Sequence, residues 1–474
     1  MTFVSMEFGI LLVVALIGFA LLTGRSRVMF MLLASYVFYA YWNPWYAFLI
    51  LTSTTIDYFA AQWIASTSNQ RNRQIALWIS IIANLGLLGY FKYTNFGLHI
   101  LHQLLGANAT FLPRSLDILL PVGISFYTFQ SMAYTIDVYR GRIPPEKNFA
   151  VFALFVSFFP QLVAGPIERA ADLLPQLKKM RPADPELFES GVRLLLWGFA
   201  KKLVVADRLY YAAEPLLREP QLLTIPDLLF STLGLFTMLY FDFSAYTDMA
   251  RGAAALFGVR LTENFRMPLA ATSIAEFWRG WHITLSSWVR DYVFIPLGGS
   301  RPKSMLHMAA VSLLTMGLVG LWHGAHWNYV IWGLQHGAMM VLYQIYYLKI
   351  RRRWRKKTFV ESSWFAFLGW TVTMGLHAFG MAWFFSPTFQ HALACFGRFV
   401  TIKAWALPNF NVTYTGFLVL IALWLIHWIC GRWFPLERTT RLPPILRGLF
   451  YATLFFIIVF LGVSRSHTFV YFQF

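Results

Sequence analysis

Apolar segments long enough to cross a bilayer recur along this chain from its first residues to its last. Because a transmembrane helix needs about 20 mainly apolar residues, these segments predict an all-α, polytopic membrane protein with roughly eleven spans. Composition agrees, since 58% of the residues are hydrophobic and only 13% are charged. Clear examples of such runs occupy residues 8–22, 75–91, 226–241, 327–348, 364–386, 412–431 and 446–464.

The excess of basic over acidic residues in this chain is best explained by the orientation of its helices in the membrane. The formal net charge is +18, and basic residues collect in the cytoplasmic loops of membrane proteins, where they also meet anionic lipid head groups. The run KIRRRWRKK at 349–357 is the strongest signal of this kind and predicts a cytoplasmic helix end. We therefore expect membrane lipids, and no nucleic acid, as partners of the basic face. A coenzyme's phosphates could share that face.

Any chemistry is expected within the membrane bundle or at its faces, because no stretch between the apolar runs is long enough for a separate catalytic domain. Residues 1–474 are accordingly predicted to form one membrane-embedded domain. The segment FAVFALFVSFFPQLVAGPIER at 149–169 is broken by Pro160 and again by Gly165–Pro166. A lipid-facing helix does not normally carry such breaks. A re-entrant segment that lines a cavity can, since other protein or water satisfies its freed backbone groups.

Acidic residues and cysteines give little sign of a metal centre. Asp242 and Asp248 lie near the end of an apolar run, where carboxylates serve as metal ligands, proton carriers or simple interface polarity. Local salt bridging of these aspartates to Arg251 is the simplest interpretation. The two cysteines, Cys395 and Cys430, indicate neither a disulfide framework nor a cysteine metal site.

Two histidines, His282 and His323, are the strongest candidates for chemistry, because a titratable ring in a membrane is costly unless it has a partner or a task. His282 lies in residues 276–291, which we treat as one helix at about 100° per residue. It then falls on the boundary between an apolar face (Trp278, Trp281, Leu285 and Trp288) and a polar face (Glu276, Arg279, Ser287 and Arg290). Ser286 lies one turn away. This position predicts an imidazole that packs on one side and opens to a polar cavity on the other.

His323 lies among small residues. The pairs Gly320–Gly324 and Gly333–Gly337 have the small-xxx-small spacing that lets helix backbones approach closely. We expect this packing to hold His323 deep in the bundle beside Trp322, where a near-neutral imidazole can take a proton from a hydroxyl. An interhelical hydrogen bond and a metal site shared with His326 remain alternatives. No nearby Cys or Glu-x-x-His pattern strengthens the metal alternative, so no metal is predicted.

Eight stretches in order, from about residue 85 to the C-terminus, carry a resemblance to a known family. They are GYFKYTNF, LLPVGISFYTFQSMAYTIDVYRG, FFPQLVAGPIER, YFDFSAYTDMARG, ENFRMP, SIAEFWRGWHITLSSWVRDYVFIPLGGSR, GLWHGAHWNYVIWGLQHG and VYFQF. The sequence resembles the membrane-bound O-acyltransferases, and within them the bacterial branch typified by the membrane subunit of alginate O-acetylation. The family core would span about 85–345, followed by C-terminal helices at 364–464. Gly280 departs from the usual arginine in WRRWH, and Ala245 from the glycine in FDFSGYSDMA.

The resemblance implies a fold and a site. Family members are multi-helix bundles with re-entrant segments around a central funnel, and two active residues lie near its middle. His323 matches the family's essential histidine, and His282 takes the second active-site position. The resemblance thus predicts these two as catalytic. The cavity and its support are expected from Trp278, Arg279, Trp281, Ser286, Trp322 and Asn328.

The resemblance also implies an activity, which is acyl transfer to a hydroxyl across the bilayer. The donor is expected to be cytoplasmic acetyl-CoA, with no bound cofactor. The acceptor would be an exported polysaccharide such as alginate or cellulose, reached directly or through a periplasmic acetyltransferase partner at a bacterial inner membrane. Two rival functions are D-alanyl transfer to teichoic acid by a related branch, and a non-enzymatic transporter or export channel, which broken helices also favour.

Overall fold

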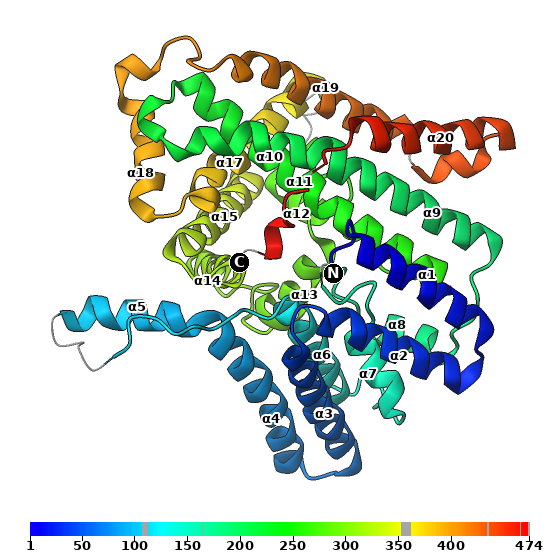
Figure 1. Ribbon diagram of the computed structural model, residues 1–474. Helices are drawn as coiled ribbons and strands as arrows, with labels where there is room; N and C mark the ends of the chain where they lie inside the picture. The colour runs from blue at the N-terminus through cyan, green and yellow to red at the C-terminus, as the bar shows by residue number, and fades with distance from the viewer. Residues whose placement is uncertain (107–111, 164, 352–361, 434–435, 465, 473–474) are drawn as a thin grey trace. The chain divides into compact units, whose positions relative to one another are not determined.

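The computed structural model describes residues 1–106, 112–163, 165–351, 362–433, 436–464 and 466–472, and all regular structure in these ranges is helical (Figure 1). The all-α prediction is therefore confirmed. Within the described residues, six helical segments are long and apolar enough to cross a membrane, which makes the protein multi-pass. The larger number of spans stays a prediction. The six are Gln70–Leu105, α11 (Ile225–Leu256), α14 (Met305–His323), α17 (Ser363–Phe385), α19 (Asn411–Trp433) and α20 (Pro444–Leu461).

Contacts between residues divide the chain into two compact units. The first comprises residues 1–198 and 246–262, and the second comprises residues 199–245 and 263–474. The single-domain organisation stays a prediction. Of the basic run at 349–357, residues 352–357 lie outside the described ranges.

The first unit consists mainly of the N-terminal helices and the C-terminal part of α11. Its core includes a buried carboxylate, Asp57, which accepts hydrogen bonds from Ser80 Oγ at 2.5 Å and from Asn84 Nδ2 at 2.9 Å. These hydrogen bonds connect α3 to α4. The helices are α1 (Met6–Leu21), α2 (Gly24–Ala40), α3 (Pro44–Ser66), α4 (Gln70–Leu88), α5 (Thr94–Leu105), α6 (Ile124–Tyr139), α7 (Phe149–Ser157), α8 (Ala170–Lys178) and most of α9 (Pro185–Ala200).

The apolar segment at 149–169 breaks as its prolines predict. α7 ends at Ser157 and, with nine residues, is too short to cross a bilayer. Side chains satisfy the backbone groups that the break frees: Phe159 N donates to Ser35 Oγ at 3.1 Å, and Gln161 Nε2 donates to Phe155 O at 3.0 Å. The surrounding protein thus supplies the partners that a broken segment needs. A re-entrant path through the membrane stays a prediction.

The second unit holds both candidate histidines. α14 and α15 pack side by side here with glycine against glycine, since a Cβ on Gly320 would lie 2.1 Å from Tyr329 O and one on Gly333 would lie 2.2 Å from Met316 O. The predicted close approach at these glycines is confirmed. Besides α14, α17, α19 and α20, the unit contains α10 (Asp207–Ala213), the N-terminal part of α11, α12 (Ile274–Gly280), α13 (Ile283–Val289), α15 (Trp327–Tyr346) and α18 (Phe389–Gly397).

The two aspartates of α11 have different partners, so the predicted interpretation is half right. Asp248 pairs with Arg251 at 3.4 Å, as expected. Asp242 instead pairs with Lys202 at 2.7 Å, and both side chains are 1% exposed. On a helix Arg251 lies nine positions after Asp242, which at about 100° per residue places it on the opposite face. The predicted pairing of Asp242 with Arg251 is therefore wrong.

Candidate active site

The helix predicted for 276–291 is broken at His282. α12 ends at Gly280 and α13 begins at Ile283, while His282 adopts a left-handed backbone conformation with φ of 42°. Side-chain-bearing residues rarely adopt this conformation, and the strained positions that do cluster at functional sites. The single-helix prediction is wrong because backbone contacts from a distant loop hold the turn. Arg266 N donates to Gly280 O at 2.8 Å, and Ile283 N donates to Asn264 O at 2.9 Å.

Gly280 permits that loop to approach. A Cβ at this position would lie 2.3 Å from Arg266 O, so a larger residue would push the two backbones apart. The glycine that departs from the WRRWH pattern is thus matched to the local backbone of this chain. Its change would move the turn that carries His282.

Asn264 orients the His282 ring. Its Oδ1 accepts from Thr284 N at 3.1 Å and from Thr284 Oγ1 at 2.9 Å, and it lies 3.2 Å from His282 Nδ1. Because a backbone N–H donates to this amide atom, the atom is an oxygen and can only accept. Nδ1 of His282 must therefore carry a proton, and the neutral ring presents Nε2 as a lone pair. The ring is completely buried.

His323 is the last residue of α14 and is 3% exposed. Aromatic rings enclose its imidazole, with ring centroids of Trp322 at 4.8 Å, Trp332 at 5.0 Å and Phe384 at 5.6 Å. The glycine contacts between α14 and α15 fix the helix that carries it. The predicted deep burial of His323 beside Trp322 is confirmed.

The two histidines belong to one aromatic cluster. Trp322 contacts both, with ring centroids 6.2 Å from His282 and 4.8 Å from His323. A second path runs through Phe243, which lies 4.7 Å from His282 and 4.3 Å from Tyr471. Tyr471 in turn lies 5.5 Å from His323. Residues 41 positions apart are thus brought to a single buried centre.

Tyr471 and Phe243 are site residues that the sequence reasoning missed. The Tyr471 hydroxyl is buried and has no hydrogen-bond partner among the described residues, so a polar group of a substrate could bind it. The tail VYFQF was one of the matching stretches, which was a signal of its importance. Nothing in its pattern indicated that it folds back against the histidines.

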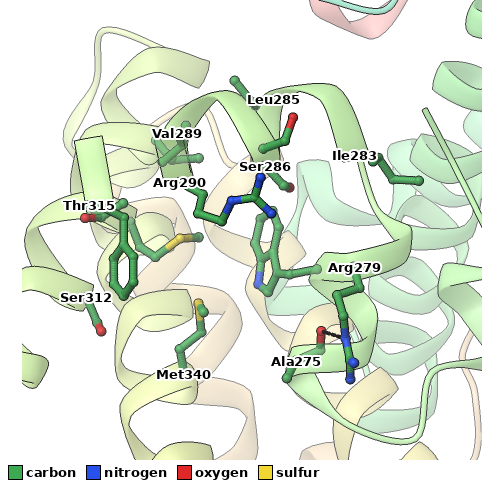
Figure 2. Close-up of a pocket in the computed structure, with 15 residues that line it drawn as sticks. Ala275, Arg279, Ile283, Leu285, Ser286, Val289, Arg290, Ser312, Thr315 and Met340 are labelled. Atoms are coloured by element: carbon green, nitrogen blue, oxygen red, sulfur yellow. Dashed lines mark hydrogen bonds between the residues drawn. The ribbon is translucent and has the colours of Figure 1, made fainter. Parts of the chain in front are cut away.

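A cavity of about 460 Å³ is lined by residues of α12, α13, α14 and α15 (Figure 2). Its volume is in the range of small-molecule sites, and its walls are mainly apolar. Three predicted residues line it: Trp278, Arg279 and Ser286. Neither imidazole lines it, although Ile283 follows His282 directly and Val319 lies one turn before His323. The helices next to the two histidines thus form part of the cavity wall, while the rings themselves lie outside it.

The mouth of the cavity carries two arginines, of which Arg290 pairs with Asp291 at 2.8 Å. Arg279 and Arg290 are exposed lining residues, and Arg279 Nε donates to Ala275 O at 3.1 Å, as drawn in Figure 2. Inside, the buried Thr315 hydroxyl has no hydrogen-bond partner among the described residues. A ligand with an anionic end and a slender polar arm would match this distribution.

Two other predicted supporting residues lie outside the cavity wall. Trp281 stacks on Phe277 with ring centroids 5.3 Å apart and planes 18° apart. Asn328 Nδ2 donates to Ser386 O at 2.9 Å. Both are buried and fix neighbouring elements. Their part in catalysis stays a prediction.

His326 has a helix-capping contact. Its Nδ1 accepts from Asn328 N at 3.2 Å at the start of α15. Across the described ranges, no group of three or more His, Cys, Asp and Glu side chains is placed to hold a metal ion.

A second pair of buried histidines was also missed. His336 lies 5.0 Å from His377 and 4.3 Å from Trp332, measured between ring centroids. His377 Nδ1 is 2.7 Å from Thr373 O, so that nitrogen is the donor. Neither ring nitrogen of His336 has a hydrogen-bond partner in the part of the chain that the structure describes. Trp332 connects this pair to His323.

Comparisons with known proteins identify a family for this chain. The model of the membrane-bound O-acyltransferase family matches residues 144–386, which contain both His282 and His323. The probable alginate O-acetylase AlgI of Pseudomonas aeruginosa is 37% identical over 87% of this chain and 77% of its own length. The peptidoglycan O-acetyltransferase of Helicobacter pylori is 32% identical over 82% of this chain and 77% of its own. The teichoic acid D-alanyltransferase of Bacillus subtilis is 29% identical over 57% of this chain and 70% of its own.

These matches agree with the multi-pass helical fold. The O-acetyltransferase relatives extend over most of the chain, and the matched region covers the catalytic candidates and the cavity. The protein is an O-acyltransferase and belongs to the membrane-bound O-acyltransferase family.

Proposed function

We propose that this protein transfers acetyl groups from acetyl-CoA to hydroxyls of an exported polysaccharide at a bacterial inner membrane. The observation that carries the proposal is the buried centre in which Trp322 contacts both His282 and His323. The helices next to these histidines also line a cavity with arginines at its mouth. Support comes from relatives named as an alginate O-acetylase and a peptidoglycan O-acetyltransferase. Alginate or cellulose would suit such a site as acceptor.

The cavity fits the donor. Guanidinium groups bind phosphate oxygens in a planar, two-pronged geometry, so Arg279 and Arg290 would hold the phosphates of the coenzyme at the mouth. The narrow apolar interior would take the pantetheine arm, and the Thr315 hydroxyl would bind one of its amides. The acetyl thioester would then reach the histidines. No bound cofactor takes part.

His323 would act as general base. Its imidazole would take the proton of the acceptor hydroxyl as that oxygen attacks the thioester carbonyl carbon. Collapse of the tetrahedral adduct breaks the carbon–sulfur bond, forms the ester and expels the coenzyme thiolate. The proton held on His323 passes to that sulfur, so the enzyme returns to its starting state.

His282 would orient the acceptor. With Nδ1–H committed to Asn264, the neutral ring offers only an acceptor at Nε2. Because the reacting hydroxyl gives its only proton to His323, Nε2 of His282 would accept from a neighbouring hydroxyl of the acceptor sugar. An acceptor atom of this kind cannot stabilise the negative oxygen of the tetrahedral adduct. The orienting role is therefore the one that this tautomer permits.

The acceptor would reach the active site from the side of the membrane opposite to the donor. Transfer would occur directly onto the polysaccharide or through a periplasmic acetyltransferase that relays the group. Membrane lipids surround the protein in this proposal, and nucleic acid has no part. The exposed basic residues serve topology and donor binding.

The decisive experiment replaces His323 with alanine. Reconstituted His323→Ala protein should transfer labelled acetyl groups from acetyl-CoA at least about a hundredfold more slowly, the usual contribution of a general base. His307→Ala at the other end of α14 is the matched control, because that ring accepts from Lys303 N and lies outside the cavity wall. Normal transfer by a stably inserted His323→Ala protein would refute the mechanism.

D-alanyl transfer to teichoic acid is the second candidate, favoured by the Bacillus subtilis relative. Its lower identity and smaller coverage rank it behind acetyl transfer. Ester analysis of the surface polymer distinguishes the two, since alanyl rather than acetyl esters would overturn our proposal. An export channel is set aside because the chain belongs to an enzyme family.

A further inference from the structure

The C-terminal tail, residues 466–472, is held by a buried charge cluster. Lys202 Nζ contacts three oxygens: Asp242 Oδ1 at 2.7 Å, Asp207 Oδ1 at 2.8 Å and the backbone oxygen of His467 at 2.8 Å. An ammonium has three N–H donors, so this arrangement uses all of them. Asp242 Oδ2 also accepts from Val470 N at 3.1 Å. The cluster thus contacts the tail at two points.

The chain that leads into the tail is anchored to the same region. Lys202 lies in a π-helical turn, Lys201–Ala206, and such turns occur often at functional sites. Leu203 O of this turn accepts from Val463 N at 3.1 Å. Arg208, just beyond it, donates to Leu461 O at 2.7 Å. One short segment therefore holds the chain from the end of α20 to the tail.

Packing alone does not require these charges. Lys202 and Asp242 are each 1% exposed and Asp207 is 2% exposed, so their removal from water is costly. Apolar residues of similar size often stabilise a core as well or better. The charges instead fix particular atoms of the tail, because Lys202 donates to His467 O and Asp242 accepts from Val470 N. This favours a positioning role.

The contacts set which tail residue faces the histidines. Val470 N is bound by Asp242, and the next residue, Tyr471, lies 5.5 Å from His323 and 4.3 Å from Phe243. Residues Val470–Phe472 form a 3₁₀ turn, in which a shift of one residue moves a side chain by about 2 Å along the axis and about 120° around it. Such a shift would replace Tyr471 with Val470 or Phe472 against His323.

We propose that Lys202 and Asp242 form a latch that holds the tail in register, and that they are positioning residues acting through Tyr471 on the catalytic centre. Asp207 completes the latch by neutralising Lys202. The inference rests on the proposed acetyl transfer for its effect on rate. The placement of the tail itself is measured without any activity.

Tail release is measured by the reactivity of an introduced cysteine. Val470→Cys in a Cys430→Ser background places a thiol at a site that is 1% exposed, while the buried Cys395 reports whether the fold is intact. A small membrane-permeant maleimide should label the introduced thiol slowly with the latch present. Lys202→Met or Asp242→Ala should speed labelling on the order of tenfold or more, because either leaves a buried charge without its partner.

Two variants keep the test specific. Lys201→Met removes the adjacent buried lysine, whose amine donates to Ser244 Oγ at 2.9 Å, and should leave labelling slow. Lys202→Arg keeps the charge and should restore slow labelling. If Lys202→Met does not accumulate, Lys202→Gln is the milder variant, and labelling between the parent and Asp242→Ala is expected. Unchanged labelling of Cys395 is required throughout.

The rate measurement completes the test. In latch variants that release the tail, kcat for acetyl transfer should fall about tenfold, while KM for acetyl-CoA stays within about twofold, because the donor cavity is not touched. Slow labelling in both Lys202→Met and Asp242→Ala would overturn the latch. Fast labelling with an unchanged kcat would overturn its link to catalysis. Absence of acetyl transfer in the parent protein would refute the proposed function, and labelling would still decide the latch.

Discussion

Replacing Asn264 with alanine should disable the proposed centre without changing either histidine. Asn264 Oδ1 is within hydrogen-bond distance of three donors: His282 Nδ1, Thr284 N and Thr284 Oγ1. A net contribution of about 1 kcal/mol for each bond gives a loss of about 3 kcal/mol in the free energy of unfolding. His282 would also lose the acceptor that fixes its tautomer. A penalty of about 1.4 to 2.7 kcal/mol in the transition state corresponds to a loss of about 10- to 100-fold in kcat/KM.

The assay separates stability from chemistry. Thermal unfolding and acetyl transfer from acetyl-CoA are measured on the same detergent-purified protein. Thr284→Val is the matched control, because it removes the hydroxyl that donates to Asn264 and leaves the bond between Asn264 and the ring. It should cost about 1 kcal/mol of stability and keep kcat/KM within about threefold.

Asn264→Asp tests the tautomer directly. The carboxylate can accept the same three bonds but places a buried negative charge beside the ring, which favours the doubly protonated imidazolium. Nε2 would then donate instead of accept, so transfer should fall although the protein stays folded. Full activity of Asn264→Asp, or parent-like kcat/KM in a destabilised Asn264→Ala, would refute the reasoning.

Two further predictions concern pH and the donor. Burial raises the pKa of Glu168 from its usual 4.5 to about 7, so the folded state binds the proton more tightly and stability falls as the pH rises from about 4.5 to 7, by about 3 kcal/mol in total. Glu168→Gln should remove most of this pH dependence of stability. Thermal unfolding of the parent and the variant at pH 5 and pH 8 measures it, and an equal change in both proteins between the two pH values would contradict the prediction. Arg279→Ala and Arg290→Ala should each raise KM for acetyl-CoA about fivefold but leave KM for acetyl-pantetheine unchanged, since that donor lacks the nucleotide phosphates. Arg266→Ala, whose guanidinium pairs with Glu263 at 2.7 Å, is the control, and an equal rise with both donors would count against a phosphate site.

Much of the fold could be predicted because its causes are local. A run of apolar residues of sufficient length dictates a membrane helix, and Pro160 dictates where α7 must already have ended. The glycines at 320 and 333 have no side chains, so they mark where α14 and α15 come closest. Each of these features is decided within a few residues.

The turn at His282 could not be predicted in the same way. Residues 276–291 have the periodicity of a helix, and local preference alone would continue α12 into α13. Hydrogen bonds from Asn264 and Arg266, which lie before α12 and outside that window, hold the break. Tertiary contacts overrule a local pattern here, as expected at a strained functional position.

The wrong partner of Asp242 could have been excluded from the sequence, but its actual tail contact could not have been predicted. Helical geometry alone excluded Arg251 as its partner, since nine positions place the two on opposite faces. Its actual tail contact, with Val470, lies 228 positions away along the chain. No spacing rule connects residues at that distance. Only the folded chain shows that α11 and the tail meet.

The unequal roles that we propose for the two histidines follow from what surrounds each ring. His282 is held by Asn264 in a single tautomer, so a change in its protonation would disturb the turn that it occupies. His323 ends α14, and the partial negative charge of a helix C-terminus would stabilise a proton that its ring gains during the proposed transfer. In the proposed mechanism, a proton gained during transfer is thus favoured at His323 and opposed at His282. The backbone around each ring, more than the identity of the two side chains, is therefore our reason for assigning the base to His323.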